Sequence, residues 1–492
     1  MKYNRTSRST TVLAALSFSG TAAIAQQQTY SQNVRQFNVV YIMADDLNCD
    51  MGSFDDPIVK TPNLDRLRQH AVRFSNAYCQ YPLSGPSRAS IMTGLYAEQT
   101  HVEDIHATTF LRDSIPNVVT LPQLFRNNGY YVARVGKIFH AGVPGDIGRN
   151  GKDDPLSWDQ VYNPIGLDKT EEHRVINYTP NRNLGSSMSY LNIVASDDEL
   201  TDGISANVAS YLIRKNKQKP FFIALGFYRP HTPYIAPSRY FDMYPLDSIT
   251  LPYVPKNDWD NKPVWARFNK KLDWGLPELS RREVKRAYYA SVSFVDAQIG
   301  KILDTLEKEG LTDNTIIVFH SDHGYHLGQH GQWFKQSLYE HVANTPLIIS
   351  VPGLTKKKAS TSNIVEFVDI YPTIATICGL KGIPTHLSGK SLQPVLAEPE
   401  KDFGYVAYTS LRRYHKGGKA SDADVRGRAI RTSRYRYIEW DNGEKGVELY
   451  DYSSDPGEFN NLYGNRKYRK LQEELHLQLQ QKVAHVLTRI PN

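Results

Sequence analysis

The sequence predicts an α/β protein with a large, mixed but mostly parallel β-sheet flanked by helices, and a smaller C-terminal subdomain with an antiparallel sheet. Three observations lead to this fold class. Apolar runs without alternation occupy 37–43, 221–227 and 315–319, which is typical of strands buried on both faces of a parallel sheet. Helical patterns separate these runs, and each run ends in a polar cluster. After about Gly389 the pattern changes to short alternating segments.

The elements follow one another in a regular order. After the first apolar run, Thr61 is a predicted helix N-cap and Pro62 stands at the first helical position. A second helix is predicted over 84–93. The segment 281–311 has apolar residues at helical spacing, so we expect a long amphipathic helix there that leads into the run at 315–319.

The N-terminus has the pattern of a secretory signal. The basic residues Lys2, Arg5 and Arg8 precede an apolar stretch that ends in small residues at 23–25. This stretch is short and interrupted by serine and glycine, so we expect a cleaved signal peptide and no permanent membrane anchor. The predicted location is outside the cytoplasm, in a bacterial periplasm or secreted.

A signal peptide and two domains are therefore expected. Residues 1–25 form the signal peptide, 26–389 the large N-terminal domain, and 390–492 the C-terminal subdomain. The predicted elements of the last part are strands at 428–432, 435–440 and 447–451 and a closing helix at about 467–487.

Charge and cysteine content set further limits. Residues 1–25 hold three basic and no acidic residues, so the net charge of +7 falls to +4 in the mature chain. This small surplus fits an anionic substrate or no charged partner, and we expect no nucleic-acid partner. The cysteines Cys49, Cys79 and Cys378 are too few for a disulfide scaffold. The sequence does not decide whether Cys49 and Cys79 form a disulfide bond or remain free thiols.

Two acidic clusters stand at predicted strand ends. Asp45 and Asp46 follow the first apolar run, and Asp322 and His323 follow the third. Because adjacent buried carboxylates repel each other, a divalent cation between them is the favoured interpretation, with Ca²⁺ expected and Mg²⁺ possible. Alone, the Asp-Asp pair would more often be a solvated helix cap. Imidazole is an uncommon calcium ligand, so His323 is either a ligand or a support for one.

The segment 82–94 is the most informative part of the chain. Ser84 stands before a turn and a helix start, and Arg88 follows one turn later, which together make an anion site. Alone, Ser84 would be a capping serine. The full string Ser-Gly-Pro-Ser-Arg, followed by Thr93-Gly94, resembles the sulfatase signature in its serine form. The resemblance implies an alkaline-phosphatase-like fold and oxidation of Ser84 to formylglycine by a radical-type maturating enzyme.

Further motifs extend this resemblance over roughly residues 37–463. The segments 136–140, 229–234 and 322–328 look like the iduronate-2-sulfatase branch of the family. The resemblance implies that one hydroxyl of hydrated formylglycine attacks sulfur. The implied metal ligands are Asp45, Asp46, Ser84, Asp322 and His323, and the implied catalytic residues are Ser84, Arg88, Lys137, His140, His231 and Lys335.

The resemblance also assigns roles within that set. Arg88, Lys137 and Lys335 neutralise charge on the sulfonyl oxygens. His231, together with Lys335, protonates the departing sugar oxygen, and His140 takes a proton from the second hydroxyl. The implied substrate is a sulfated carbohydrate, with a 2-O-sulfate on a uronic acid or related sugar.

Two alternatives remain. One is a phosphomonoester, phosphodiester or phosphonate hydrolase of the same superfamily, with Ser84 attacking directly. It is disfavoured because the Ser-Gly-Pro-Ser-Arg string has no purpose in direct attack and one metal site is visible. The other is a non-catalytic polysaccharide-binding relic, disfavoured because every expected catalytic position is filled. Four further histidines are left open as substrate or core residues: His101, His106, His326 and His330.

Overall fold

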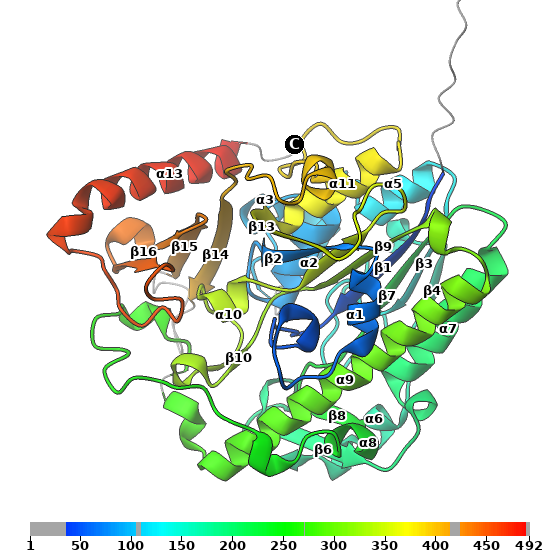
Figure 1. Cartoon of the computed structure of the whole chain (residues 1–492), viewed down its shortest axis with the longest axis horizontal. Helices are drawn as coiled ribbons and strands as arrows, with labels where there is room; N and C mark the ends of the chain where they lie inside the picture. The colour runs from blue at the N-terminus through cyan, green and yellow to red at the C-terminus, as the bar shows by residue number, and fades with distance from the viewer. Residues whose placement is uncertain (1–35, 105–109, 270, 414–423, 489–492) are drawn as a thin grey trace, which may run out of the picture. The chain divides into compact units, whose positions relative to one another are not determined.

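The computed structural model describes residues 36–104, 110–269, 271–413 and 424–488 of the chain (Figure 1). The signal peptide expected at 1–25 lies outside these ranges. Among the described helices, none has the length and apolarity needed to cross a membrane.

An eight-stranded sheet forms the centre of the fold (Figure 1). Its strand order is β13-β2-β12-β9-β1-β7-β3-β4, and β12 alone of these runs antiparallel to its neighbours. The strands are β1 Asn38–Ala44, β2 Val72–Tyr78, β3 Tyr131–Gly136, β4 Gln160–Tyr162, β7 Phe221–Gly226, β9 Thr315–Ser321, β12 Leu347–Ser350 and β13 Ala359–Glu366. The three predicted apolar runs are β1, β7 and β9, and the predicted fold class is confirmed.

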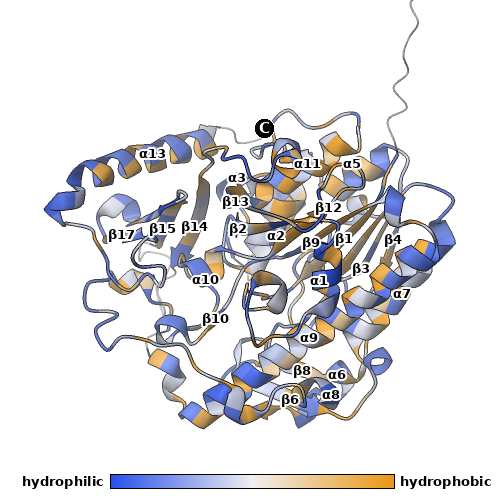
Figure 2. Cartoon of the chain, in the orientation of Figure 1, coloured by the Kyte–Doolittle hydropathy of each residue, from blue (hydrophilic) through white to orange (hydrophobic). Residues whose placement is uncertain are grey.

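Helices cover both faces of this sheet, which explains why its central strands are apolar throughout. In β1, Val40 and Ile42 pack toward one set of helices and Val39 and Tyr41 toward the other. The first set comprises α1 Pro62–Arg68, α7 Thr201–Asn216 and α9 Glu278–Lys308; the second comprises α2 Ser84–Thr93, α5 Leu121–Asn127 and α11 Ile370–Ile377. Figure 2 shows the apolar strands between helices whose outer sides are hydrophilic.

The start of α1 differs from the sequence prediction in one respect. The helix begins at Pro62 as expected, but the Thr61 hydroxyl accepts a hydrogen bond from Ser53 N (2.9 Å) and does not cap it. The carboxylate of Asp296 on α9 accepts from the backbone nitrogens of Asn63 (3.0 Å) and Leu64 (2.8 Å) instead. A residue of the neighbouring helix thus satisfies the free N–H groups at the helix start.

A second, four-stranded antiparallel sheet with the order β14-β15-β16-β17 lies near the C-terminus, as predicted (Figure 1). It is built from β14 Ala407–Arg413, β15 Val425–Arg431, β16 Tyr435–Trp440 and β17 Val447–Asp451, and is covered by α13 Arg469–Thr488. The strand β14 was not predicted from the sequence. The domain boundary at 389 remains a prediction.

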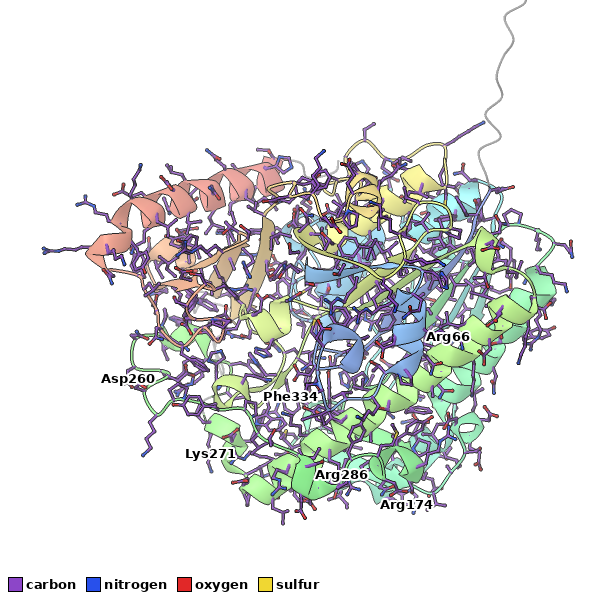
Figure 3. All side chains as sticks on the ribbon, viewed as in Figure 1. Arg66, Arg174, Asp260, Lys271, Arg286 and Phe334 are labelled. Atoms are coloured by element: carbon purple, nitrogen blue, oxygen red, sulfur yellow. The ribbon has the colours of Figure 1, made fainter. Side chains whose placement is uncertain are left out.

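Two small sheets were also not predicted. They are β5 Ile176–Asn177 with β6 Ser189–Ile193 and β8 Tyr234–Pro237, and β10 His326–Leu327 with β11 Trp333–Phe334. Phe334 at the end of β11 is labelled in Figure 3. The remaining short helices are α3 Ala97–Thr100, α4 Leu111–Ser114, α6 Leu167–Thr170, α8 Ser238–Phe241, α10 Glu340–Ala343 and α12 Gln393–Ala397.

Candidate active site

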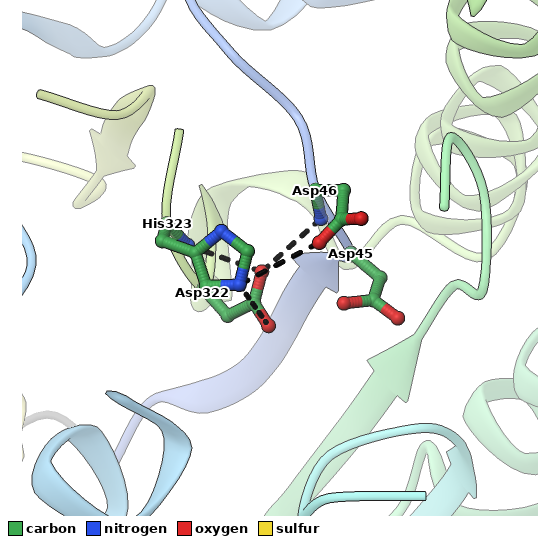
Figure 4. Close-up of side chains that lie close together, drawn as sticks. All are labelled: Asp45, Asp46, Asp322 and His323. Carbon is green, nitrogen blue, oxygen red and sulfur yellow. Dashed lines mark hydrogen bonds and ion pairs between the residues drawn. The ribbon is translucent and has the colours of Figure 1, made fainter. Parts of the chain in front are cut away.

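The two acidic clusters meet where β1 and β9 end. These strands pair in parallel, with Ala44 opposite Ser321, so the residues that follow them emerge side by side. The side chains that meet there are Asp45, Asp46, Asp322 and His323, shown in Figure 4. All four are buried, and one ligand atom from each lies within 4.8 Å of all the others.

His323 presents a nitrogen lone pair to the carboxylates. Its Nδ1 lies 2.9 Å from the carbonyl oxygen of Gly324, which can only accept, so Nδ1 carries the proton. Its Nε2 lies 3.5 Å from Asp46 Oδ1 and 3.5 Å from Asp322 Oδ2 (Figure 4). Burial lowers the pKa of His323 to about 4, so the ring is neutral near pH 7. A neutral ring with Nε2 unprotonated is the form that binds a metal ion.

The charge distribution fits a divalent cation. Burial, with Asp45 and Asp322 close by, raises the pKa of Asp46 to about 7 although Lys335 opposes the shift. Asp46 Oδ2 is buried and has no hydrogen-bond partner among the described residues. Three carboxylates and one imidazole in a single buried cluster are a hard-cation donor set with one softer member. The residues present therefore fit Ca²⁺ or Mg²⁺.

Ser84 faces this cluster and does not cap its helix. It is the first residue of α2, and the N-cap is Leu83. Its Oγ lies 3.1 Å from Asp45 Oδ1 and 3.1 Å from His323 Nε2, and the residue is 2% exposed. The capping interpretation is wrong, because the hydroxyl is turned to the ends of β1 and β9. A metal-ligand role for Ser84 remains a prediction.

Arg88 connects the helix to both acidic clusters. Its Nε donates to Asp322 Oδ2 (2.9 Å), and its Nη2 lies 3.3 Å from Asp45 Oδ1. Its Nη1 donates to the carbonyl oxygens of Lys137 (2.7 Å) and Ile138 (3.0 Å). The guanidinium is fully buried, and although burial alone would lower the pKa of Arg88, Asp322 and Asp45 raise it. A permanent cation is therefore fixed at the base of the site.

Lys137 is placed by a close approach of two strand ends. A Cβ on Gly136 would lie 2.1 Å from the carbonyl oxygen of Gly226, and Gly136 has a φ of +70°. Only glycine fits this contact. The Lys137 backbone nitrogen donates to the same carbonyl (2.9 Å), and its Nζ pairs with Asp45.

Three further predicted residues line one pocket beside the cluster. Lys335 Nζ donates to Asp46 Oδ1 (2.6 Å), and His231 Nε2 lies 3.6 Å from Asp46 Oδ2. His140 Nδ1 is buried and has no partner among the described residues. Burial, reinforced by nearby lysines, holds the pKa of both histidines well below the ordinary value. Both rings are therefore neutral near pH 7.

The pocket has a volume of about 660 Å³ and brings together His140, His231, Lys335 and Asp46. Sequence reasoning missed its other walls, which include Arg182, Asn183, Phe268, Tyr325, Phe334 and Gln336. For the wall that contains Arg182 and Asn183, the sequence offers only a polar stretch at 181–187 that is rich in Asn, Gly and Ser. This composition predicts a loop and nothing more specific.

The remaining predicted histidines lie elsewhere. His326 and His330 are buried, and His330 Nδ1 lies 3.0 Å from Asp258 Oδ2. Neither these nor His101 line the pocket, and His106 lies outside the described residues. Cys49, Cys79 and Cys378 are all free thiols.

The family model named Sulfatase matches residues 37–380. The chain belongs to the sulfatase family. A second model, for the C-terminal part of N-sulphoglucosamine sulphohydrolase, matches residues 328–485 of this sulfatase. Mouse iduronate 2-sulfatase is 32% identical over 519 residues, covering 89% of this chain and 93% of the relative.

Two solved structures share the fold of this chain. One, in complex with its substrate D-glucosamine-2-N,6-O-disulfate, has a TM-score of 0.70 and 25% identity, covering 92% of this chain and 98% of the other. A phosphonate monoester hydrolase from Silicibacter pomeroyi has a TM-score of 0.73 at 23% identity, covering 92% and 96%, and shows a shared fold. The protein is thus a sulfuric ester hydrolase with the alkaline-phosphatase-like fold and relatives that act on carbohydrate sulfates.

Proposed function

We propose that this sulfatase hydrolyses a sulfate ester on a carbohydrate, with formylglycine derived from Ser84 as its nucleophile and Ca²⁺, or Mg²⁺, as its metal. The observation that carries this proposal is the position of Ser84 Oγ, 3.1 Å from both Asp45 and His323 in a buried cluster. The proposed metal ligands are Asp45, Asp46, Asp322 and His323 together with residue 84.

The metal ion and formylglycine would supply the central chemistry. A bound divalent cation supplies positive charge for the oxygens of the sulfate group. Formylglycine, once hydrated, would supply one hydroxyl as the nucleophile for sulfur and a second hydroxyl whose proton loss would allow sulfate to leave.

The chain's own residues then orient the sulfate and move protons. Arg88 holds Asp45 and Asp322 in place, while Lys137 and Lys335 place two ammonium groups where negative charge develops on the sulfonyl oxygens. His140 is neutral, and its buried Nδ1 has no hydrogen-bond partner in the described part of the chain, so it is suited to accept a proton.

Lys335 and His231 are the two candidates to protonate the departing sugar oxygen. His231 Nδ1 lies 2.6 Å from the carbonyl oxygen of Thr232, so in the neutral ring Nδ1 carries the proton and Nε2 does not. The Lys335 ammonium, whose pKa is raised by Asp46 and Asp45 although burial opposes this, already holds a proton at the pocket wall. We therefore assign the donated proton to Lys335, with His231 beside it.

The proposed substrate is a 2-O-sulfate on a uronic acid or a related sugar. Likeness to mouse iduronate 2-sulfatase supports this choice, and the pocket has the size expected for a small-molecule site. Export through residues 1–25 and maturation by a radical-type enzyme belong to the same proposal, as does the division into domains at 26–389 and 390–492.

A phosphomonoester or phosphonate hydrolase is the second candidate, because the phosphonate monoester hydrolase from Silicibacter pomeroyi shares the fold. Matched sulfate and phosphate esters of one sugar separate the two. We expect protein produced with a radical maturase to prefer the sulfate by at least about tenfold in kcat/KM, or ~1.4 kcal/mol. Ser84→Ala is the inactive control, and a tenfold preference for phosphate would refute the sulfatase proposal.

A further inference from the structure

One cation in the active-site pocket has no role in the sulfate chemistry described above. Arg182 lines the pocket together with His140, His231 and Lys335. It is half-buried, and it forms no ion pair with a carboxylate among the described residues. Burial lowers the pKa of Arg182, and no carboxylate in the described ranges offsets this shift. A partly desolvated cation without a counter-ion is unfavourable unless something else supplies the negative charge.

The guanidinium is held in one orientation. Arg182 Nε donates to the carbonyl oxygen of Ser186 (2.6 Å), and its Cζ lies 4.1 Å from the ring centroid of Trp274. Neither Nη nitrogen has a hydrogen-bond acceptor among the described residues. Stacking on an indole fixes the guanidinium plane and leaves its outer N–H groups free for an oxyanion.

Trp274, on which the guanidinium stacks, is held in place by the segment that carries Lys335. Trp274 packs edge-on against Phe334, with ring centroids 5.4 Å apart, and Phe334 precedes Lys335. The adjacent Asp273 accepts from Trp333 Nε1 (3.0 Å) and pairs with Arg281 of α9. Both Asp273 (φ 51°) and Trp274 (φ 56°) have left-handed backbones, which non-glycine residues adopt only when their surroundings hold them there.

The loop that carries Arg182 packs against two segments of the site, one containing Val143 and the other containing His231. Gly185 packs so closely that a Cβ there would lie 2.0 Å from the carbonyl oxygen of Val143. The Thr232 hydroxyl, one residue after His231, donates to the carbonyl oxygen of Ser187 (2.6 Å). Arg182 is therefore positioned relative to His231 by packing and by a hydrogen bond.

We propose that Arg182, supported by Trp274, binds a second anionic group of the substrate, separate from the sulfate that is hydrolysed. A carboxylate and a second sulfate share the chemistry that this site recognises, since both present paired oxygens to a planar guanidinium. This inference rests on the proposed function for the position of the scissile sulfate. It adds a specificity requirement: the sugar, or its immediate neighbour, carries two negative groups.

Binding to the unmodified Ser84 protein tests this directly by isothermal titration calorimetry. The first ligand pair is a 2-O-sulfated uronic acid methyl glycoside and its carboxyl-reduced counterpart. The second pair is glucosamine bearing 2-N- and 6-O-sulfates and N-acetylglucosamine bearing the 6-O-sulfate alone. We expect Arg182→Gln to weaken binding of the doubly charged member of one pair by about 10- to 100-fold, and that of its singly charged partner by less than twofold. The pair that responds identifies carboxylate or sulfate.

Matched variants separate recognition from general charge. Arg174→Gln removes a guanidinium that is 52% exposed, pairs with Glu171 and lies outside the pocket lining. We expect this variant to bind all four ligands with the wild-type affinity. Arg174 is labelled at the lower edge of Figure 3, well apart from Phe334. Arg182→Lys is expected to restore only part of the affinity, because an ammonium cannot pair with two oxygens through a planar fork.

Three results would overturn the inference. They are a change of less than twofold for both doubly charged ligands, an equal loss for both members of each pair, and no measurable binding of any of the four ligands to the wild-type protein. Failure of the proposed function is separate, since it means that the formylglycine form releases no sulfate from any ester.

Discussion

Lys335 Nζ lies 2.6 Å from Asp46 Oδ1, so a residue just after β11 completes the charge cluster that begins at the end of β1. The residues on both sides of Lys335 have left-handed backbones, with φ of 76° at Phe334 and 64° at Gln336. Strained backbone at a site persists where the surrounding structure holds it in place. The lysine is thus presented to the cluster in one defined geometry.

Lys335→Ala is expected to lower kcat/KM for a sulfate ester by about 100- to 1000-fold, because it removes an ammonium group from the developing charge. Lys335→Arg should recover part of this loss. The matched control is Lys401→Ala, whose side chain is 57% exposed and lies outside the pocket lining. Unchanged kcat/KM in Lys335→Ala would remove this residue from the mechanism.

Calcium is expected to raise the thermal unfolding midpoint, since a cation that binds the folded cluster stabilises it by about 2.7 kcal/mol at 100 times Kd. Differential scanning calorimetry with and without chelator measures the effect. Asp322→Asn should abolish most of it, because one carboxylate of the cluster is lost. Exposed Asp242→Asn is the control. A wild-type midpoint that neither Ca²⁺ nor Mg²⁺ shifts would contradict the metal assignment.

Asp296→Ala is expected to lower the free energy of unfolding by about 1–3 kcal/mol, measured by urea denaturation. The carboxylate accepts two backbone N–H groups at the start of α1, and both lose their acceptor in the variant. Asp304→Ala, on the same helix with a side chain 49% exposed, should change stability by less than about 0.5 kcal/mol. Equal effects in the two variants would show that Asp296 is not the cap.

Glu340 is expected to make stability sensitive to acid. Burial alone would raise its pKa, but Arg431 and Arg436 lower it from 4.5 to about 2. Because the pKa in the folded protein is below that of the unfolded chain, the stabilisation is fully present above about pH 4.5 and is lost as the pH falls toward 2. Its size is on the order of 3 kcal/mol.

Urea denaturation of wild type and Glu340→Gln at several pH values checks this prediction. The difference in unfolding free energy should be largest near pH 7 and shrink below pH 4.5. Glu398→Gln, with a side chain 62% exposed, is the control. A difference that does not depend on pH would contradict the assignment to Glu340 ionisation.

Much of the site could be predicted because its residues follow strands that the sequence makes visible. The apolar run of β1 is buried on both faces, and its pairing with β9 brings Asp45 and Asp322 to one edge. The end of a continuous apolar run in the sequence therefore shows where a buried strand ends, and the polar residues that follow it are candidates for the site. The position of Ser84 came from a resemblance and not from periodicity, since residues 84–93 are buried all round and have no amphipathic pattern.

The pocket walls could not be predicted, because they come from segments without a periodic signal. Arg182 lies in a loop between two short strands, and only the folded chain brings it onto Trp274, which is 92 positions later in the printed sequence. Thr61 failed as a cap for the same reason, since Asp296 on α9 reaches α1 through tertiary packing. Local residue preferences carry no information about such distant partners.

The most direct test of the proposed function is mass spectrometry of the peptide containing Ser84, together with sulfate release by the same preparation. Protein produced with a radical-type maturating enzyme should show loss of two hydrogens at Ser84, and its rate of sulfate release should rise with the fraction converted. Protein with unmodified serine should be nearly inactive. Full sulfatase activity in a preparation whose Ser84 is entirely unmodified would contradict the formylglycine mechanism.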